Sequence, residues 1–286
     1  MHCHKNTSLC GLLLVFIFIS CHDKAQYKGP VGYDINNPVT FFMPNSLHEI
    51  SGISFLNDNA DSICAIEDET GKLFYFTLGS EKINYSKFAK KGDFEDVAIL
   101  NKSTVAVLRS DGSVFLFATS EIGKEKIDSV QEFINILPEG EYEGLGAADG
   151  KLFALCKKCM VDNEKKEVSV YTLQQNDSGL LAVNSSLKID LSPIPKDEKK
   201  GNGKGKFHPS CIAKNPITHE WYIISAVNNL LLVLDEQWKI KESFPLDPSL
   251  FKQPEGMAFN ARGDLYISNE GGEGTANVLE FKYRKP

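Results

Sequence analysis

The sequence predicts an all-β protein, a β-propeller of five four-stranded blades whose ring is closed by an N-terminal strand in the last blade. Three observations support this prediction. One segment recurs five times along the 286 residues, and each copy is followed by short β-rich runs separated by Gly, Asn and Asp. The last unit lacks one strand, which the N-terminal region supplies. Repeats of roughly 40–50 residues with four strands each are typical of propeller blades.

The recurring segment is the first strand of each unit. Its five copies are HEISGISFL (48–56), GDFEDVAIL (92–100), GEYEGLGAA (140–148), FHPSCIAKN (207–215) and KQPEGMAFN (252–260). Taking Ser51, Glu95, Glu143, Ser210 and Glu255 as equivalent, the steps between units are 44, 48, 67 and 45 residues. The long third step indicates an insertion. A sixth, degenerate blade hidden between Cys156 and Lys206 is the alternative.

The later runs of each unit are rich in Val, Ile, Phe and Tyr, and none has the sustained spacing of three and four that indicates a helix. The one modest exception is SVQEFINIL (129–137), for which we expect a short helix. The fifth unit ends at Pro286 without a fourth strand. The run VTFFM (39–43) has no partner of its own, so we expect it to complete the fifth blade as its outer strand and remove an exposed sheet edge.

The first twenty residues predict a signal peptide: a short polar start and an apolar run too short to span a bilayer comfortably. The run ends at Ser20–Cys21, which resembles a lipobox and predicts a lipid on Cys21; an ordinary cleaved signal is the alternative. We therefore expect a lipoprotein signal over 1–20, a tether over 21–35 and the propeller over 36–286. The expected location is the bacterial cell envelope, in the outer or inner membrane, facing the periplasm or the cell surface.

The repeat predicts an acidic mouth. In a propeller the first strand of each blade begins, and the second ends, at the same face of the disc. This geometry gathers the candidate metal ligands Glu95, Glu143, Glu255, Glu67 and Glu270 and the candidate ligand-binding residues Ser51, Arg109, Ser210 and Asn269. Carboxylates held together repel one another, so protons, Arg109 or a cation must offset their charge. Hard oxygen ligands favour Ca²⁺ as that cation, and glutamates that merely hold the blades together are the alternative.

Two histidines and two cysteines lie near the same face. His48 and His208 are candidate general bases, with solvated loop residues as the alternative. Cys156 and Cys159 form a C-x-x-C at the end of a second strand, for which a disulfide in an oxidising envelope is favoured over two free thiols. The net charge of −7 carries no long like-charged block, which excludes a nucleic-acid footprint and is compatible with cationic or neutral partners. We expect a monomer.

Several stretches together are similar to one family. HPSCIAKNPITHEWYIISAVNNLLLVLD, QPEGMAFNARGDLYISNEGG, EISGISF and FEDVAIL resemble the SdiA-regulated family of bacterial envelope proteins over residues 45–283. The resemblance implies a β-propeller that is secreted or lipid-anchored, and it names a fold and compartment more firmly than a reaction. Ser51 and Ser210 depart from the Glu of the other units, and Asp96 replaces the Gly of Glu-Gly.

Three function classes follow from these features. The first is a module that binds a small ligand or an envelope protein through its acidic mouth. The second is a calcium-dependent hydrolase, of the lactonase or phosphoesterase kind, with its site in the same mouth. The third is a structural scaffold of the envelope. No nucleophile motif or spaced metal motif is present, so we expect binding rather than catalysis.

Overall fold

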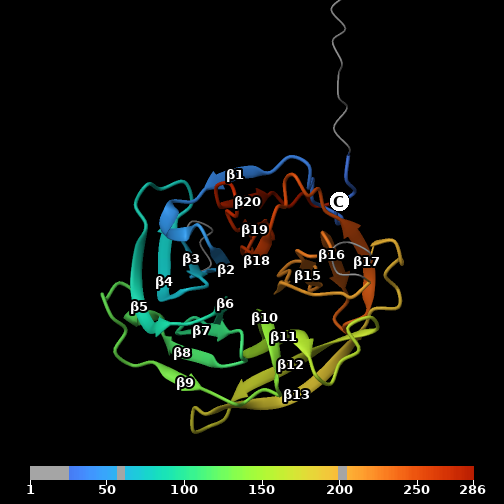
Figure 1. The fold of residues 1–286 in the computed structure, drawn as a ribbon. Helices are drawn as coiled ribbons and strands as arrows, with labels where there is room; N and C mark the ends of the chain where they lie inside the picture. Colours follow the sequence, from blue (N-terminus) through green and yellow to red (C-terminus); the bar gives the residue numbers. More distant parts are fainter. Residues whose placement is uncertain (1–25, 57–61, 199–204) are drawn as a thin grey trace, which may run out of the picture.

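The computed structural model describes residues 26–56, 62–198 and 205–286, and this part of the chain forms five four-stranded antiparallel sheets arranged in a ring (Figure 1). The prediction of a five-bladed propeller is confirmed. The six-blade alternative is wrong, because the chain after Cys156 adds only the two outer strands of the third blade before the fourth begins. The predicted signal peptide and Cys21 lie outside the described residues.

The blades follow one another along the chain, each built from the channel outward. Blade I consists of β2 (Ile50–Phe55), β3 (Ser62–Glu67), β4 (Thr70–Thr77) and β5 (Asn84–Lys91). Blade II consists of β6 (Phe94–Asn101), β7 (Thr104–Arg109), β8 (Val114–Ala118) and β9 (Gln131–Phe133). Blade III consists of β10 (Gly140–Ala148), β11 (Lys151–Cys159), β12 (Glu167–Gln175) and β13 (Leu181–Asp190).

The last two blades complete the ring. Blade IV consists of β14 (Cys211–Lys214), β15 (Trp221–Ser225), β16 (Leu230–Leu234) and β17 (Ile240–Pro245). Blade V consists of β18 (Pro254–Phe259), β19 (Leu265–Asn269), β20 (Asn277–Phe281) and β1 (Val39–Phe42). The helices in the described ranges are two 3₁₀ turns, η1 (Asn45–Leu47) and η2 (Thr119–Glu121). None of the described helices is long and apolar enough to cross a bilayer.

The expected short helix at 129–137 is wrong. This stretch supplies β9, in which Gln131 pairs with Leu116 and Phe133 with Val114 of β8. Without β9, β8 would present the unpaired edge of its blade to solvent, so pairing with the neighbouring strand overrides the weak local helical pattern.

The N-terminal strand closes the ring as predicted. β1 pairs antiparallel with β20, with Val39 opposite Glu280 and Phe42 opposite Asn277. The preceding segment is also bound to the disc: the Tyr33 hydroxyl donates to the Gly263 carbonyl at 2.5 Å and accepts from the Asn215 amide at 2.8 Å. Tyr33 and Ile35 are buried. The last residues of the predicted tether of 21–35 therefore pack against the propeller.

Apolar side chains fill the spaces between neighbouring blades. Between blades III and IV, Trp221 stacks on Trp238 with ring centroids 4.4 Å apart, and the edge of Phe153 meets Trp221 at 4.7 Å. Phe88 and Phe94 pack edge to face between blades I and II, 5.0 Å apart. Burial of these large side chains supplies the main driving force for joining one blade to the next.

The inner strands lie so close together that their backbones leave no space for side chains between them. A Cβ on Gly52 would lie 2.3 Å from Asp96 Oδ1 and 2.6 Å from the Val97 amide nitrogen, and a Cβ on Gly256 would lie 2.3 Å from the Ser51 carbonyl oxygen. Gly52 follows Ser51 in blade I, and Gly256 follows Glu255 in blade V. The five equivalent residues of the repeat, which we call the ring residues, are Ser51, Glu95, Glu143, Ser210 and Glu255. The Gly of the repeated pattern is thus explained by close approach of strands from adjacent blades.

Replacing Gly52 by Ala should therefore destabilise the fold. The new methyl group would meet the backbone of Asp96 and Val97 and also the Asp96 carboxylate, which hydrogen bonds from the Val97 and Leu145 amides hold in place. We therefore expect a loss of about 1–3 kcal/mol in the free energy of unfolding, measured by urea denaturation. Gly274→Ala is the matched control, because the nearest atom to its Cβ is the flexible end of Lys252 at 3.3 Å. Equal stability of the two variants would contradict the close packing of the inner ring.

Candidate functional site

Four of the five equivalent residues of the repeat occupy β-bulges at one end of the inner strands, and the fifth, Ser210, lies just before β14. Ser51, Glu95, Glu143 and Glu255 each fall at an interruption of the register between the first and second strands of their blade. A bulge places an extra residue on one strand and turns its side chain out of the regular alternation. Ladder pairs beside the bulges, such as Ile50 with Glu67, show that the second strand ends where the first begins. The sequence-predicted mouth lies at this end.

Glu95, Glu143 and Glu255, called here the inner carboxylates, lie close enough to raise one another's pKa. Burial, then the neighbouring Glu143 and Asp93, raises the pKa of Glu95 to about 9. Burial and Glu143 raise the pKa of Glu255 to about 7, although the Ser210 hydroxyl and Lys157 act in the opposite direction. Burial also raises the pKa of Glu143. The three acids predicted from separate blades thus converge on one opening.

Lys157 supplies the positive charge that offsets these acids. Its ammonium nitrogen lies 2.6 Å from Glu143 Oε1 and 3.4 Å from Glu141 Oε1. Burial lowers the pKa of this lysine, but Glu143 and Glu141 outweigh burial and the net shift is upward. Arg109, expected to play this part, instead pairs with Asp111 at 2.9 Å and Glu132 at 3.1 Å.

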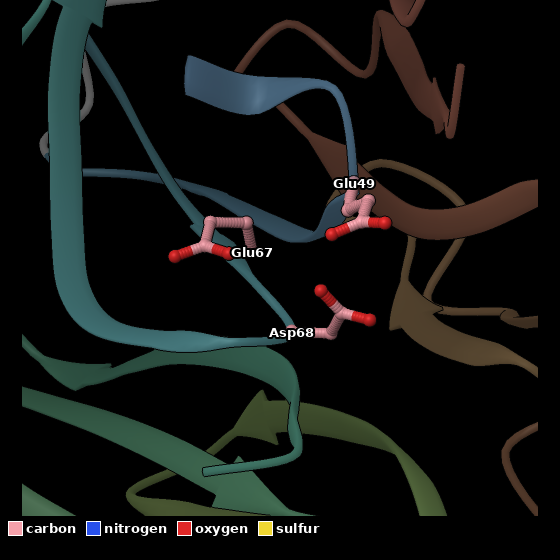
Figure 2. A group of neighbouring side chains, drawn as sticks. All are labelled: Glu49, Glu67 and Asp68. Carbon is pink, nitrogen blue, oxygen red and sulfur yellow. The ribbon is translucent and has the colours of Figure 1, made fainter. Parts of the chain in front are cut away.

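A second acidic group lies at the beginning of blade I. Figure 2 shows Glu49, just before β2, and Asp68, just after β3, with their carboxyl groups facing one another, and Glu67 beside them. Each of the three offers an oxygen atom within 4.8 Å of the others. We call Glu49, Glu67 and Asp68 the outer cluster. Of the predicted metal ligands, only Glu67 belongs to it.

The outer cluster combines one fixed carboxylate with one that has spare acceptors. Glu67 accepts hydrogen bonds from the backbone amides of Glu69 at 3.1 Å and Thr70 at 2.8 Å, which fix its orientation. Asp68 Oδ1 is buried and accepts no hydrogen bond from the described residues. Burial, followed by the charges of Glu49 and Glu270, raises the pKa of Asp68 to about 6. A carboxylate oxygen in this state is disposed to accept a cation or a donor from a ligand.

Glu270 borders the outer cluster. Its carboxylate accepts a hydrogen bond from the Gln253 side-chain amide, and burial together with Glu49 raises its pKa. The fully buried Asn269 donates to Asn277 Oδ1 at 3.0 Å, while its own Oδ1 has no partner among the described residues. Asn269 is the last residue of β19 and Glu270 follows it directly, at the end of the second strand where the repeat places them.

The two ring serines are buried and serve contacts between strands. The Ser51 carbonyl accepts from the Ser268 hydroxyl at 2.7 Å, which ties blade I to blade V. Ser210 Oγ accepts from the Ala226 amide at 3.2 Å, and its side chain also hydrogen-bonds Glu255. Ser210 therefore contacts an inner carboxylate, whereas Ser51 takes a structural position.

The two histidines differ in their surroundings. His48 holds the loop after Glu270: its carbonyl accepts from the Gly271 amide at 2.8 Å, and its ring Nε2 lies 3.3 Å from the Gly274 carbonyl. His208 Nε2 is buried, lies 3.7 Å from Glu164 and has no hydrogen-bond partner among the described residues. Burial lowers the pKa of His208, which favours its neutral form. His208 therefore offers a buried ring nitrogen without a hydrogen-bond partner among the described residues, whereas Nε2 of His48 faces a backbone carbonyl.

The C-x-x-C motif forms a disulfide between Cys156 and Cys159 at the end of β11, the pairing that the sequence predicts. Gly140, at the start of β10, lies against both sulfurs. The bridge encloses Lys157 and Lys158 at the mouth. Cys64 and Cys211 are free and buried.

Two residues of the site escaped the sequence analysis. In blade I the repeat is aligned on Ser51. The acid Glu49 lies two residues earlier, so the repeat pattern does not include it. Lys157 lies inside the C-x-x-C motif, a pattern that indicates thiol chemistry rather than a charged site residue. An acidic residue next to the ring position and a basic one at a second-strand end were the available signals.

The raised pKa of Glu95 predicts a pH dependence of stability. Between the ordinary value of 4.5 and about 9, the folded protein keeps a proton that the unfolded chain has released. The free energy of unfolding should therefore fall as pH rises through this window, by at most about 1.4 kcal/mol per pH unit. Urea denaturation from pH 5 to 9 should show a shallower decline for Glu95→Gln. The exposed Glu236→Gln should keep the wild-type slope; identical curves for wild type and Glu95→Gln would contradict the assignment.

One solved structure of very different sequence shares the fold of this chain. A PQQ-bound aldose sugar dehydrogenase from Streptomyces coelicolor matches at 10% identity with a TM-score of 0.52, covering 87% of this chain and 99% of that one. A luciferin-regenerating enzyme matches at 10% identity (TM-score 0.48; 86% and 95% covered). A catalytically inactive virginiamycin B lyase from Staphylococcus aureus with quinupristin matches at 9% identity, with a TM-score of 0.48, covering 86% of this chain and 88% of that one. At these identities the likeness concerns the fold alone.

The family comparison covers most of the propeller. No curated protein matches the sequence. The family model described as SdiA-regulated matches residues 43–272, which runs from the end of β1 to the loop after β19 and includes the outer cluster, the inner carboxylates and the disulfide. The match spans well over half of the chain and agrees with the resemblance found in the sequence. The chain therefore belongs to the SdiA-regulated family.

Proposed function

We propose that this protein is a lipid-anchored binding module of the bacterial envelope that takes up a cationic ligand at its acidic mouth, with Ca²⁺ bound by the outer cluster. The observation that carries the proposal is the placement of Glu49, Glu67 and Asp68, whose carboxyl oxygens approach within 4.8 Å of one another. The signal sequence ending at Cys21 supports the location and the anchor.

The electrostatics of the outer cluster favour a cation over an anion or a neutral group. No Lys or Arg of the described chain forms an ion pair with any of its three members. Burial and neighbouring acids raise the pKa values of Asp68 and Glu67. A bound cation removes this mutual repulsion and stabilises the ionised carboxylates.

The donor set suits Ca²⁺ among the common cations. Ca²⁺ takes six to eight oxygen ligands in flexible geometry, whereas Zn²⁺ prefers imidazole and thiolate. The outer cluster offers only carboxylate oxygens, and Glu270 adds another acid nearby. The backbone amides that hold Glu67 orient a ligand carboxylate in the way that outer hydrogen bonds do at metal sites.

A calcium-dependent hydrolase is the second candidate, and His208 is the observation that favours it. Its buried Nε2, which has no hydrogen-bond partner in the part of the chain that the structure describes, and its lowered pKa are suited to a general base. Esters, lactones and phosphate esters, each assayed with and without Ca²⁺, test this candidate. Turnover that is lost in His208→Gln would replace the binding proposal with the hydrolase; absence of turnover leaves the binding module.

Calcium titration of the mature protein tests the binding proposal. Isothermal calorimetry should show one Ca²⁺ site, and Asp68→Asn should weaken it at least tenfold, because the substitution removes a charged ligand from a cluster of three. Asp177→Asn, in the exposed turn between β12 and β13, is the matched control and should keep the wild-type affinity. A wild type that binds no Ca²⁺, or an Asp68→Asn variant that binds it unchanged, would remove Ca²⁺ from the outer cluster.

A further inference from the structure

We propose that Lys157, held in place by the Cys156–Cys159 disulfide, is the specificity-determining residue of the mouth. Its ammonium group occupies the position of a cation at the inner carboxylates and so restricts free cations to the outer cluster. The assignment of the outer cluster to Ca²⁺ rests on the proposed function, whereas the position of Lys157 does not.

The register between β10 and β11 brings Lys157 to Glu143. Glu141 pairs with Lys158 and Tyr142 with Cys156, so Lys157 is the extra residue on β11. On β10, Tyr142 and Gly144 pair with the consecutive residues Cys156 and Leu155, so Glu143 is the extra residue there. Two bulges therefore lie at the same level of the ladder, one on each strand. They bring the two extra side chains together as an ion pair of 2.6 Å.

The disulfide fixes the backbone that carries Lys157. It joins positions three apart, with Cα atoms 5.9 Å from each other, and its loop contains only Lys157 and Lys158. Both cysteines are buried, and the Gly140 backbone packs against their sulfurs. A lysine side chain and the backbone that carries it both lose conformational entropy when they are ordered. Restraining its backbone beforehand lowers the remaining cost of placing the ammonium at Glu143.

A tethered ammonium competes strongly with a free ion. A group attached through a short linker acts at an effective concentration in the millimolar range, even when the linker is flexible. A free cation must displace Lys157 from Glu143, which breaks the ion pair of 2.6 Å and leaves the half-buried ammonium with Glu141 alone. The outer cluster has no such internal competitor among the described lysines and arginines. The inner carboxylates are thus paired with Lys157, whereas the outer cluster is left for a free cation.

The number of Ca²⁺ ions bound tests this assignment. Calorimetry of the wild type should give one site, and Lys157→Gln should add a second, because the inner carboxylates lose their internal cation. Lys158→Gln is the matched control: it alters the exposed lysine in the same disulfide loop and should leave the number at one. A single site in Lys157→Gln would overturn the proposal. No site in the wild type but one in Lys157→Gln would support it while overturning calcium binding at the outer cluster.

Amine acetylation provides a readout that needs no calcium. With a water-soluble acetylating ester, the Lys157 amine should react at least tenfold more slowly than that of the exposed Lys126, as followed by mass spectrometry. In the double variant Cys156→Ala/Cys159→Ala, this protection should decrease while Lys126 is unchanged. This double variant also provides the second test of the site count if Lys157→Gln does not fold. Equal reactivity of Lys157 and Lys126 in the wild type would overturn the proposal.

Discussion

The close approach of five inner strands is the constraint on which the rest of the structure depends. Five blades make a narrow ring, so the first strand of one blade meets the first strand of the next almost backbone to backbone. Gly52 and Gly256 allow this approach, and the buried Asp96 accepts from the Leu145 amide at 2.7 Å across one junction. In the tightest places of the ring, hydrogen bonds and glycines hold the blades together, whereas apolar side chains fill the wider spaces farther out.

The bulges at the mouth follow from the same narrow ring. A regular ladder would point alternate side chains into the crowded space between blades, whereas a bulge turns the ring residue toward the opening. The repeat can therefore carry a Glu at this place without burying it between strands. The acids then meet one another, and the fold offsets their repulsion in two ways. Protonation and the ion pair with Lys157 reduce the repulsion among the inner carboxylates. In the outer cluster, backbone amides donate hydrogen bonds to Glu67.

The sequence was sufficient for the fold because the repeat encodes it directly. The recurrence of the first strand predicts the number of blades. The N-terminal strand without a partner of its own predicts how the ring closes, and the pairing of β1 with β20 confirms this closure. The convergence of Glu95, Glu143 and Glu255 followed from that topology alone. Side-chain pairing did not follow from it. Arg109 is the last residue of β7 and Lys157 lies two residues before the end of β11, and only the register of each bulge decides which cation reaches the acids. A one-residue shift of that kind leaves no mark on the repeat pattern.

The placement of Tyr33 has a mechanical consequence. A tension applied to the chain from its N-terminal side reaches this residue before it reaches β1, and two hydrogen bonds and a cluster of aromatic rings from blades IV and V resist it there. The strand that seals the ring is thereby shielded from load. Its hydrogen bonds to β20 need only withstand thermal opening.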